Sequence, residues 1–170
     1  LSNHDQTRVA TRLKGDPAKI KLVASILCTL PGEIFIYYGE ELGMTGDKPD
    51  EQIREPFLWS GSTGDPFATY WIEAKYATPK NISPLHLQQH DNSSVFQHYR
   101  QLLQFRKAYP WLAKASLNTI DCSESSVLIY TLNGEGRQWL IMHNLTGTPT
   151  ELRKEENHTR FTVLFSHASH

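Results

Sequence analysis

The sequence predicts an α/β arrangement that gives way, near residue 115, to a small all-β domain. Residues 16–30 have the apolar spacing of a helix, and the continuous apolar run at 34–38 is typical of a strand buried in a parallel sheet. A second amphipathic helix is predicted at 92–109. Beyond it the pattern changes to short alternating segments with a hairpin signal.

The helix predicted at 16–30 has signals at both ends. Asp16 can accept hydrogen bonds from the free N–H groups of the first turn, and Pro17 is tolerated at the first helical position. Pro31 and Gly32 then end the helix. Its apolar positions follow helical spacing: Ile20, Val23, Ala24, Leu27 and Leu30.

Strands are expected on both sides of this helix. Residues 1–15 are predicted to hold the end of one strand, which runs into a polar loop, and residues 34–38 form the next strand. This makes only about one and a half βα units, too few to close a parallel sheet or to cover both of its faces. Because the sequence also opens within a motif, we expect the other strands to precede residue 1.

The segment from about 42 to 91 is irregular, with five prolines and many polar residues. Loops of this length in a compact domain are usually functional. The polar residues at 92–94 can cap the second helix, which Pro110 ends. In the last part of the chain, strands at 126–131 and 138–144 flank the turn signal at 133–136, and 160–165 reads as a further strand.

Composition excludes several classes of partner. The 17 basic and 18 acidic residues are well mixed and give a net charge of −1. Nucleic-acid binding and electrostatic membrane attachment both need clustered Lys and Arg, so neither is expected. The longest apolar run is also too short to cross a membrane. Asp47, Asp50 and Glu51 lack the spacing of a dedicated calcium site and are expected to be solvated.

The triplet Asn3-His4-Asp5 is the sharpest local feature. One interpretation is a hydrogen-bonded pair in a loop. A metal site would need further ligands at suitable spacing, and a Ser-His-Asp site would need the glycines of a nucleophile elbow; the sequence has neither. The triplet follows a predicted strand end, however, and strand ends are where a βα-barrel carries its catalytic groups.

Four segments together resemble the α-amylase family of glycoside hydrolases. Residues 1–8 are similar to the motif that ends the family's seventh barrel strand, and residues 30–44 to the segment from helix 7 to strand 8. Residues 53–59 resemble the Arg-x-Pro-x-x-Trp segment of its oligo-glucosidase-like and bacterial amylase members, and residues 93–107 its eighth barrel helix. The residues that carry the first three are Leu1-Ser2-Asn3-His4-Asp5-Gln6 with Arg8, Leu30-Pro31-Gly32 with Phe35-Ile36-Tyr37-Tyr38-Gly39-Glu40-Glu41 and Gly43-Met44, and Ile53-Arg54-Glu55-Pro56 with Trp59.

The resemblance implies a fold of class α/β plus all-β. Residues 1–115 would be the last βα units of a TIM (β/α)8 barrel, from the end of strand 7 to helix 8. Residues 116–170 would be a C-terminal antiparallel β-sandwich domain, although the resemblance is weaker there.

The resemblance also implies a retaining glycoside hydrolase that acts on α-glucosidic bonds of starch-like or malto-oligosaccharide substrates. Such enzymes use a nucleophilic carboxylate and a second carboxyl group that serves as acid and then base. In this family both precede the present segment, at the ends of strands 4 and 5. The third carboxylate maps onto Asp5, which would stabilise the transition state electrostatically. His4, Arg8 and Asn3 are the expected substrate-binding residues.

No metal site or cofactor is indicated in this chain, and calcium elsewhere in a complete enzyme is left open. Glu40 and Glu41 are expected to be structural, making hydrogen bonds in the barrel mouth, because adjacent residues on a strand point to opposite faces. Aromatic side chains in the long loop are compatible with stacking on sugar rings or with loop packing: Trp59, Tyr70 and Trp71.

Two alternative functions remain open. A transferase or isomerase of the same family would rearrange α-glucosides by the same covalent chemistry. A non-catalytic carbohydrate-binding module, built on the β domain and the loop aromatics, would need neither the triplet nor the strand end at 37–41. We also expect the chain alone to self-associate, because a strand at 34–38 without its neighbours leaves an unpaired edge and apolar surface.

Overall fold

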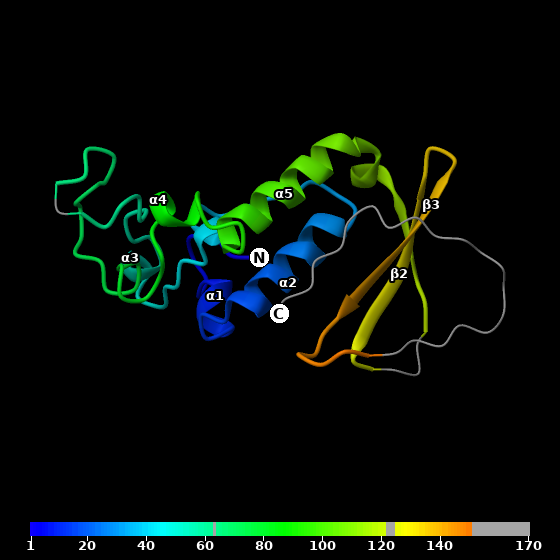
Figure 1. The fold of residues 1–170 in the computed structure, drawn as a ribbon, viewed down its shortest axis with the longest axis horizontal. Coiled ribbons are helices and arrows are strands. Elements are labelled where there is room, and N and C mark those ends of the chain that lie inside the picture. Colours follow the sequence, from blue (N-terminus) through cyan, green and yellow to red (C-terminus); the bar gives the residue numbers. More distant parts are fainter. Residues whose placement is uncertain (63, 122–124, 151–170) are drawn as a thin grey trace.

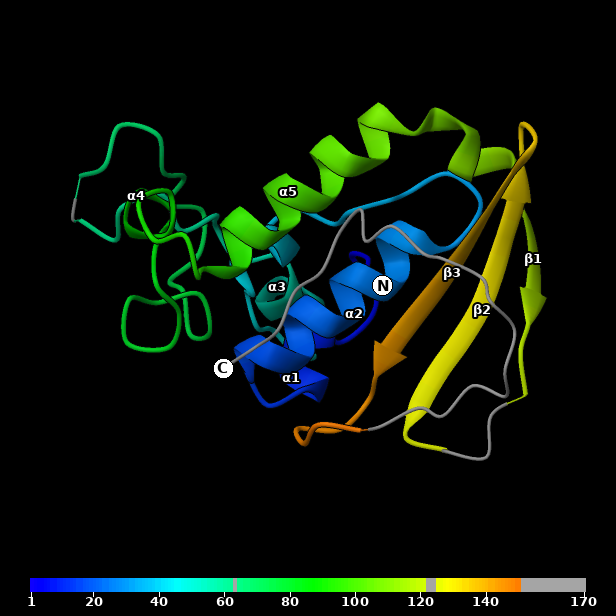
Figure 2. The same ribbon diagram turned by 45° about the vertical axis from the view of Figure 1, so that its right-hand side comes forward.

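The computed structural model describes residues 1–62, 64–121 and 125–150. Two long helices, α2 (Pro17–Thr29) and α5 (Val95–Ala108), lie side by side in the middle of the molecule (Figure 1). A three-stranded antiparallel sheet stands at one end of this helix pair, and the irregular segment before α5 lies at the other end (Figure 2). In the part of the chain so described, no helix is long and apolar enough to cross a membrane.

Helix α2 confirms the capping signals. The carboxylate of Asp16 accepts hydrogen bonds from the backbone N–H groups of Ala18 (3.0 Å) and Lys19 (3.3 Å), and Pro17 occupies the first helical position. These hydrogen bonds hold the pKa of Asp16 below its usual value. The helix ends at Thr29, and Leu30 is extended.

Helix α5 also begins and ends as predicted. The Ser94 hydroxyl accepts a hydrogen bond from the N–H of Gln97 (3.1 Å), and Pro110 opens the short 3₁₀ helix η2 (Pro110–Lys114) that follows α5. The two long helices share one buried apolar cluster, which also includes a residue of the short helix α1 (Val9–Arg12). Its members are Ala10, Ile20, Ala24, Cys28, Val95, Tyr99 and Leu102.

The two parallel strands predicted before residue 39 are wrong for this structure. Residues 1–8 form a turn and extended coil that leads into α1, and residues 34–38 are extended without being a strand. A strand exists through hydrogen bonds to a neighbour, and the described residues place none beside 34–38. Ile34 and Ile36 pack against the helical core, whereas Phe35 between them is 81% exposed. The segment is therefore covered on one side only, and self-association through it stays a prediction.

The irregular segment between residues 42 and 91 is confirmed. Its described residues, 42–62 and 64–91, include two single turns of helix, α3 (Asp50–Ile53) and α4 (Leu85–Gln88), and the segment follows the 3₁₀ turn η1 (Glu40–Leu42). A second apolar cluster lies beneath it, with the following buried members: Leu42, Met44, Leu58, Ala77, Ile82 and Leu85.

The sheet has the order β1-β2-β3, with β1 (Ser116–Thr119), β2 (Val127–Gly134) and β3 (Arg137–Asn144). The predicted hairpin is confirmed, and Gly134 pairs with Arg137 across its end. Both turn residues have positive φ, 49° for Glu135 and 69° for Gly136, as a type I′ turn requires. The strand predicted at 160–165, and with it a second layer of the predicted sandwich, lies outside the described residues.

An aromatic cluster fixes the sheet against the end of α5. The Trp139 ring on β3 lies edge-on to Tyr109 (4.6 Å between ring centroids) and to Trp111 (4.9 Å). Such edge-to-face pairs stabilise beyond the apolar area that they bury. Leu112 and Leu132, both 0% exposed, complete the packing beneath these rings.

A polar contact links α2 directly to the sheet. The Thr29 hydroxyl lies 2.6 Å from the Tyr130 hydroxyl and 3.1 Å from His143 Nε2, and Tyr130 and His143 are 3.2 Å apart. All three residues are buried, and burial lowers the pKa of His143 to about 4. His143 is therefore neutral at neutral pH, and its Nε2 can form hydrogen bonds with the hydroxyls of Thr29 and Tyr130.

This arrangement makes stability depend on pH through His143. Its pKa in the unfolded chain is about 6.5, so the unfolded state binds a proton between pH 6.5 and 4 that the folded state does not. Stability is accordingly lost as the pH falls through that window. We expect the free energy of unfolding to fall, between pH 7.5 and 4.5, by roughly 2 kcal/mol more in the wild type than in His143→Gln. Urea titrations of both proteins measure this difference, and equal losses would contradict it.

Candidate functional site

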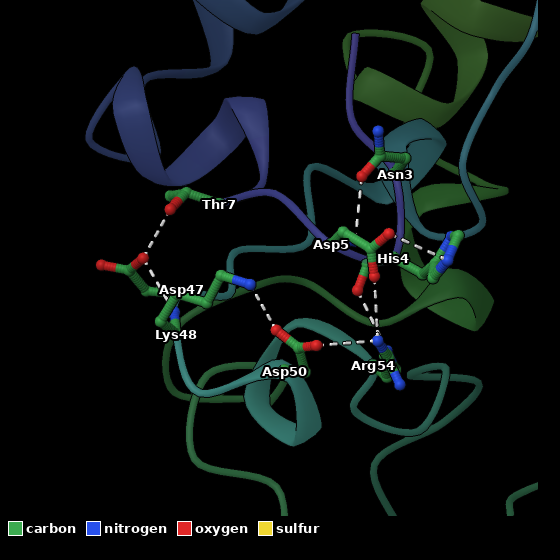
Figure 3. Close-up of polar contacts among 8 residues, drawn as sticks. All are labelled: Asn3, His4, Asp5, Thr7, Asp47, Lys48, Asp50 and Arg54. Atoms are coloured by element: carbon green, nitrogen blue, oxygen red, sulfur yellow. Dashed lines mark hydrogen bonds and ion pairs between the residues drawn. The ribbon is translucent and has the colours of Figure 1, made fainter.

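The Asn3-His4-Asp5 triplet, which precedes α1 in the sequence, forms an exposed polar corner (Figure 3). Asn3 Oδ1 accepts a hydrogen bond from the backbone N–H of Asp5 (2.9 Å). His4 Nε2 lies 3.2 Å from Asp5 Oδ2, and the two side chains are 65% and 60% exposed. The local turn thus presents the Asp5 carboxylate to solvent, with His4 beside it.

Arg54 holds this corner from the opposite loop, immediately after α3. Its Nε donates to the His4 carbonyl oxygen (3.0 Å), and its Nη2 donates to Asp5 Oδ1 (3.1 Å) and to Asp50 Oδ2 (2.9 Å). Figure 3 shows the contacts of Asp5 and Asp50 meeting at the guanidinium of Arg54. The two loops are 49 residues apart in sequence at the Arg54–Asp5 contact, and they meet around Asp5.

Further polar contacts lie between these two loops and within the second of them. The Thr7 hydroxyl donates to Asp47, and the ammonium group of Lys48 contacts Asp50. The hydrogen bond from Lys48 is the main reason why the pKa of Asp50 lies below its usual value. Asp47 and Asp50 are partly exposed, as expected, and each also has protein partners: the Thr7 hydroxyl binds Asp47, and Lys48 and Arg54 bind Asp50. Among the described residues, no group of three or more His, Cys, Asp and Glu side chains is placed to hold a metal ion.

Arg8 lies beneath the corner and is 0% exposed. Its Nε donates to the Ile53 carbonyl oxygen (2.9 Å) and its Nη1 to that of Tyr38 (2.7 Å), and its guanidinium lies over the rings of Tyr37 and Tyr38. Burial lowers its pKa. A direct sugar contact by Arg8 stays a prediction, and these contacts favour a structural role in joining three segments.

Among the described residues, Glu40 does not make the hydrogen bonds expected of it, whereas Glu41 makes them in part. Glu40 is 2% exposed, and within the described part of the chain neither of its carboxylate oxygens has a hydrogen-bond partner. One oxygen of Glu41 is in the same state, and burial raises the pKa of Glu41. The strand argument behind the expectation also fails, because both residues lie in the 3₁₀ turn η1.

The loop aromatics divide between the two interpretations left open. Trp59 packs in its loop, with ring centroids 4.6 Å from Phe57 and 6.1 Å from Phe67. Tyr70 and Trp71 are 66% and 55% exposed, and the Tyr70 hydroxyl donates to the Asp65 carbonyl oxygen. Trp59 therefore packs against other aromatic rings of the loop, whereas the rings of Tyr70 and Trp71 are open to solvent.

Sequence reasoning missed Arg54 and Asp50 as parts of this site. In the sequence, Arg54 stands out only as one residue of the Arg-x-Pro-x-x-Trp motif, and Asp50 has the pattern of a surface acid. A usable signal was present, because Asp and Arg four residues apart face each other on a helix, and α3 gives them that relation. Their contact with Asp5 required the tertiary structure.

The geometry describes a solvent-facing carboxylate held by an imidazole and a guanidinium. Such a group can offer fixed negative charge to a positive charge that develops on a bound molecule. The neighbouring carboxylate, Asp50, is 37% exposed and is engaged by both Lys48 and Arg54.

Comparisons with known proteins agree on one family. The family model "Alpha amylase, catalytic domain" matches residues 1–115. "Alpha-amylase 3" of Dictyoglomus thermophilum is 43% identical over 145 residues, which are 85% of this chain and 29% of that protein. A "4-alpha-glucanotransferase" of Thermotoga maritima is 37% identical over 150 residues, 86% of this chain and 34% of that protein.

A solved structure shows the same likeness in three dimensions. The crystal structure of an alpha-amylase from H. orenii superposes with a TM-score of 0.81 at 37% identity, covering 88% of this chain and 30% of that one. The present chain thus spans about a third, or less, of the length of these relatives.

Proposed function

Because this chain belongs to the α-amylase family, we propose that in a complete enzyme Asp5 stabilises the transition state of α-glucoside cleavage. The reaction passes through an oxocarbenium-like transition state, in which positive charge develops on the sugar ring. A fixed carboxylate nearby favours that charge over the neutral ground state. The observation that carries the proposal is the exposed Asp5 side chain, held from two sides by His4 and Arg54.

The sugar-binding residues in this proposal are His4 and Asn3. His4 is exposed beside Asp5 and can donate a hydrogen bond to a sugar hydroxyl. Asn3 shapes the turn through its side-chain oxygen, which leaves its amide group free to meet the substrate. Arg8 supports both residues by joining the segment that carries them to the backbone at Tyr38 and Ile53.

The chemistry needs two further carboxyl groups. A retaining enzyme requires a nucleophile and an acid that then acts as base. In this proposal they come from the part of the enzyme that precedes residue 1, at the ends of barrel strands 4 and 5. Residues 1–115 are then the end of a TIM (β/α)8 barrel, and 116–170 its C-terminal β domain. The end of the family match at residue 115 and the start of β1 at Ser116 support this division.

The proposed substrate is a starch-like α-glucan or malto-oligosaccharide. A glucosyl transferase is the second candidate, and the likeness to a 4-alpha-glucanotransferase favours keeping it. Both use the same glycosyl-enzyme intermediate, which water or a second sugar then resolves. A non-catalytic binding module is disfavoured, because the catalytic-domain match covers the segment that carries Asp5.

The proposal predicts a division of activity between the full-length enzyme and the chain alone. The full-length enzyme should act on maltoheptaose with retention of configuration, and residues 1–170 alone should release no sugar above the blank, because groups that act as one catalytic unit cannot replace each other. Chromatography of the products separates hydrolysis from transfer. Sugar release by purified residues 1–170, persisting through a second purification step, would contradict the proposed division of the catalytic groups.

A further inference from the structure

Arg54 is bound to two carboxylates, and only one of them belongs to the proposed catalytic corner. Its Nη2 donates to Asp5 Oδ1 (3.1 Å) and also to Asp50 Oδ2 (2.9 Å). Its Nε donates to the His4 carbonyl oxygen (3.0 Å). These hydrogen bonds to three acceptors fix the plane of the guanidinium relative to both loops (Figure 3).

Arg54 needs such fixing because its side chain is 41% exposed. An arginine with that much exposure has several rotatable bonds and loses conformational entropy when it is held in one geometry. An isolated ion pair at that exposure stabilises little. The second carboxylate, Asp50, supplies a further anchor for Arg54, at the nitrogen that also binds Asp5.

Asp50 is itself held in place. It begins the short helix α3, and the backbone N–H of Arg54 donates to the Asp50 carbonyl oxygen (3.1 Å), so the backbone sets the spacing of the two side chains. Lys48 binds the other oxygen of the Asp50 carboxylate. The charges then alternate along a chain from Lys48 through Asp50 and Arg54 to Asp5.

We propose that Asp50 is a positioning residue that acts through Arg54 to orient the Asp5 carboxylate for catalysis. The inference rests on the proposed function of Asp5. Asp50 binds the same guanidinium nitrogen, Nη2, as Asp5, so it can act on Asp5 through Arg54 and needs no contact with the sugar.

Two physical effects follow from this arrangement. With Asp50 in place, Arg54 holds Asp5 in one orientation, and misplacement of a catalytic group by about 1 Å can lower the rate by roughly 10²-fold. Asp50 also balances the charge of Arg54. Without that balance, Asp5 would face an uncompensated cation and would favour the developing positive charge on the sugar less strongly.

The test uses Asp50→Asn, Arg54→Gln and the double variant in the full-length enzyme, with a malto-oligosaccharide as substrate. Asp50→Asn should lower kcat roughly 10-fold and leave KM within about twofold, because the loss concerns the transition state. Arg54→Gln should lower kcat further. The double variant should be no worse than Arg54→Gln, since Asp50 acts only through Arg54. Asp50→Glu, which restores the charge, should recover part of kcat.

The matched control is Glu51→Gln, which removes an exposed acid from the same turn of helix. It should leave kcat unchanged, and the thermal midpoints of Glu51→Gln and Asp50→Asn should both stay within about 2 °C of the wild type, because exposed charges stabilise little. A lowered midpoint in Asp50→Asn, with kcat and KM changed together, would assign Asp50 to folding and overturn the proposal.

Asp5→Asn in the same enzyme separates this proposal from the one it rests on. If Asp5→Asn is severely impaired while Asp50→Asn has normal kcat, or if the effects of Asp50→Asn and Arg54→Gln multiply in the double variant, positioning through Arg54 is wrong. If Asp5→Asn itself has normal kcat, the proposed role of Asp5 is wrong, and the positioning role of Asp50, which rests on it, is wrong as well.

Discussion

Asp5→Asn in the full-length enzyme should lower kcat by about 10³-fold or more while leaving the fold intact. The substitution removes the negative charge and keeps nearly the same shape. Because the Asp5 side chain is 60% exposed, its replacement disturbs no packed core. Asn can still accept a hydrogen bond from Arg54, so the loops around residues 5 and 54 should stay together. The loss should therefore appear in the transition state and only weakly in KM.

Steady-state kinetics on a malto-oligosaccharide, with circular dichroism and thermal unfolding of the same samples, measure this effect. His4→Ala is the graded comparison, because it removes a proposed contact to the bound sugar but leaves the Asp5 charge. Its kcat should fall less than that of Asp5→Asn, and its KM should rise. A near-normal kcat for Asp5→Asn would mean that the transition state is stabilised by another group.

Local signals were sufficient for the helices and the hairpin. Asp16 with Pro17 marks the start of α2, and the turn at Glu135–Gly136 has the backbone that a two-residue hairpin needs. In these places the decisive hydrogen bonds join residues close in sequence, so a short window contains all the necessary information.

The segment at 34–38 could not be predicted in the same way. Its apolar and β-branched residues favour a buried strand. A strand also needs a partner elsewhere in the chain, and the described residues place none beside this segment, in which Phe35 is 81% exposed. The site shows the same division. The triplet around Asp5 stands out in the sequence, whereas the contacts of Arg54 with Asp5 and of Arg8 with Ile53 join residues 45 or more positions apart. The sequence pattern identified Asp5 and its neighbour His4, but not the distant Arg54 that also holds Asp5.

Glu55, the neighbour of Arg54, is 0% exposed and ties the long loop to the site. Its two carboxylate oxygens accept hydrogen bonds from three successive backbone N–H groups, those of Lys75 (2.8 Å), Tyr76 (2.9 and 3.1 Å) and Ala77 (2.7 Å). Consecutive N–H groups that converge on one anion form a favourable site for a carboxylate. Ala77 in turn packs in the apolar cluster beneath the loop. The Glu55 carboxylate thus orders a segment more than 20 residues away.

Glu55→Gln should therefore destabilise the protein strongly although it hardly changes the shape of the side chain. One acceptor oxygen becomes an NH₂ group that faces N–H donors, and the remaining hydrogen bonds lose their charge. Buried donors left without an acceptor cost about 1–3 kcal/mol each, so we expect the free energy of unfolding to fall by roughly 2–4 kcal/mol. Urea titration measures the change, and Glu73→Gln is the control: it alters an exposed acid of the same loop and should stay within about 0.5 kcal/mol of the wild type. If Glu55→Gln unfolded together with the control, the charge of Glu55 would be dispensable, and the loop would have to be held by its apolar contacts alone. If it unfolds earlier, the same loosening should reach Arg54 through the backbone, and kcat should fall at temperatures where the fold is still intact.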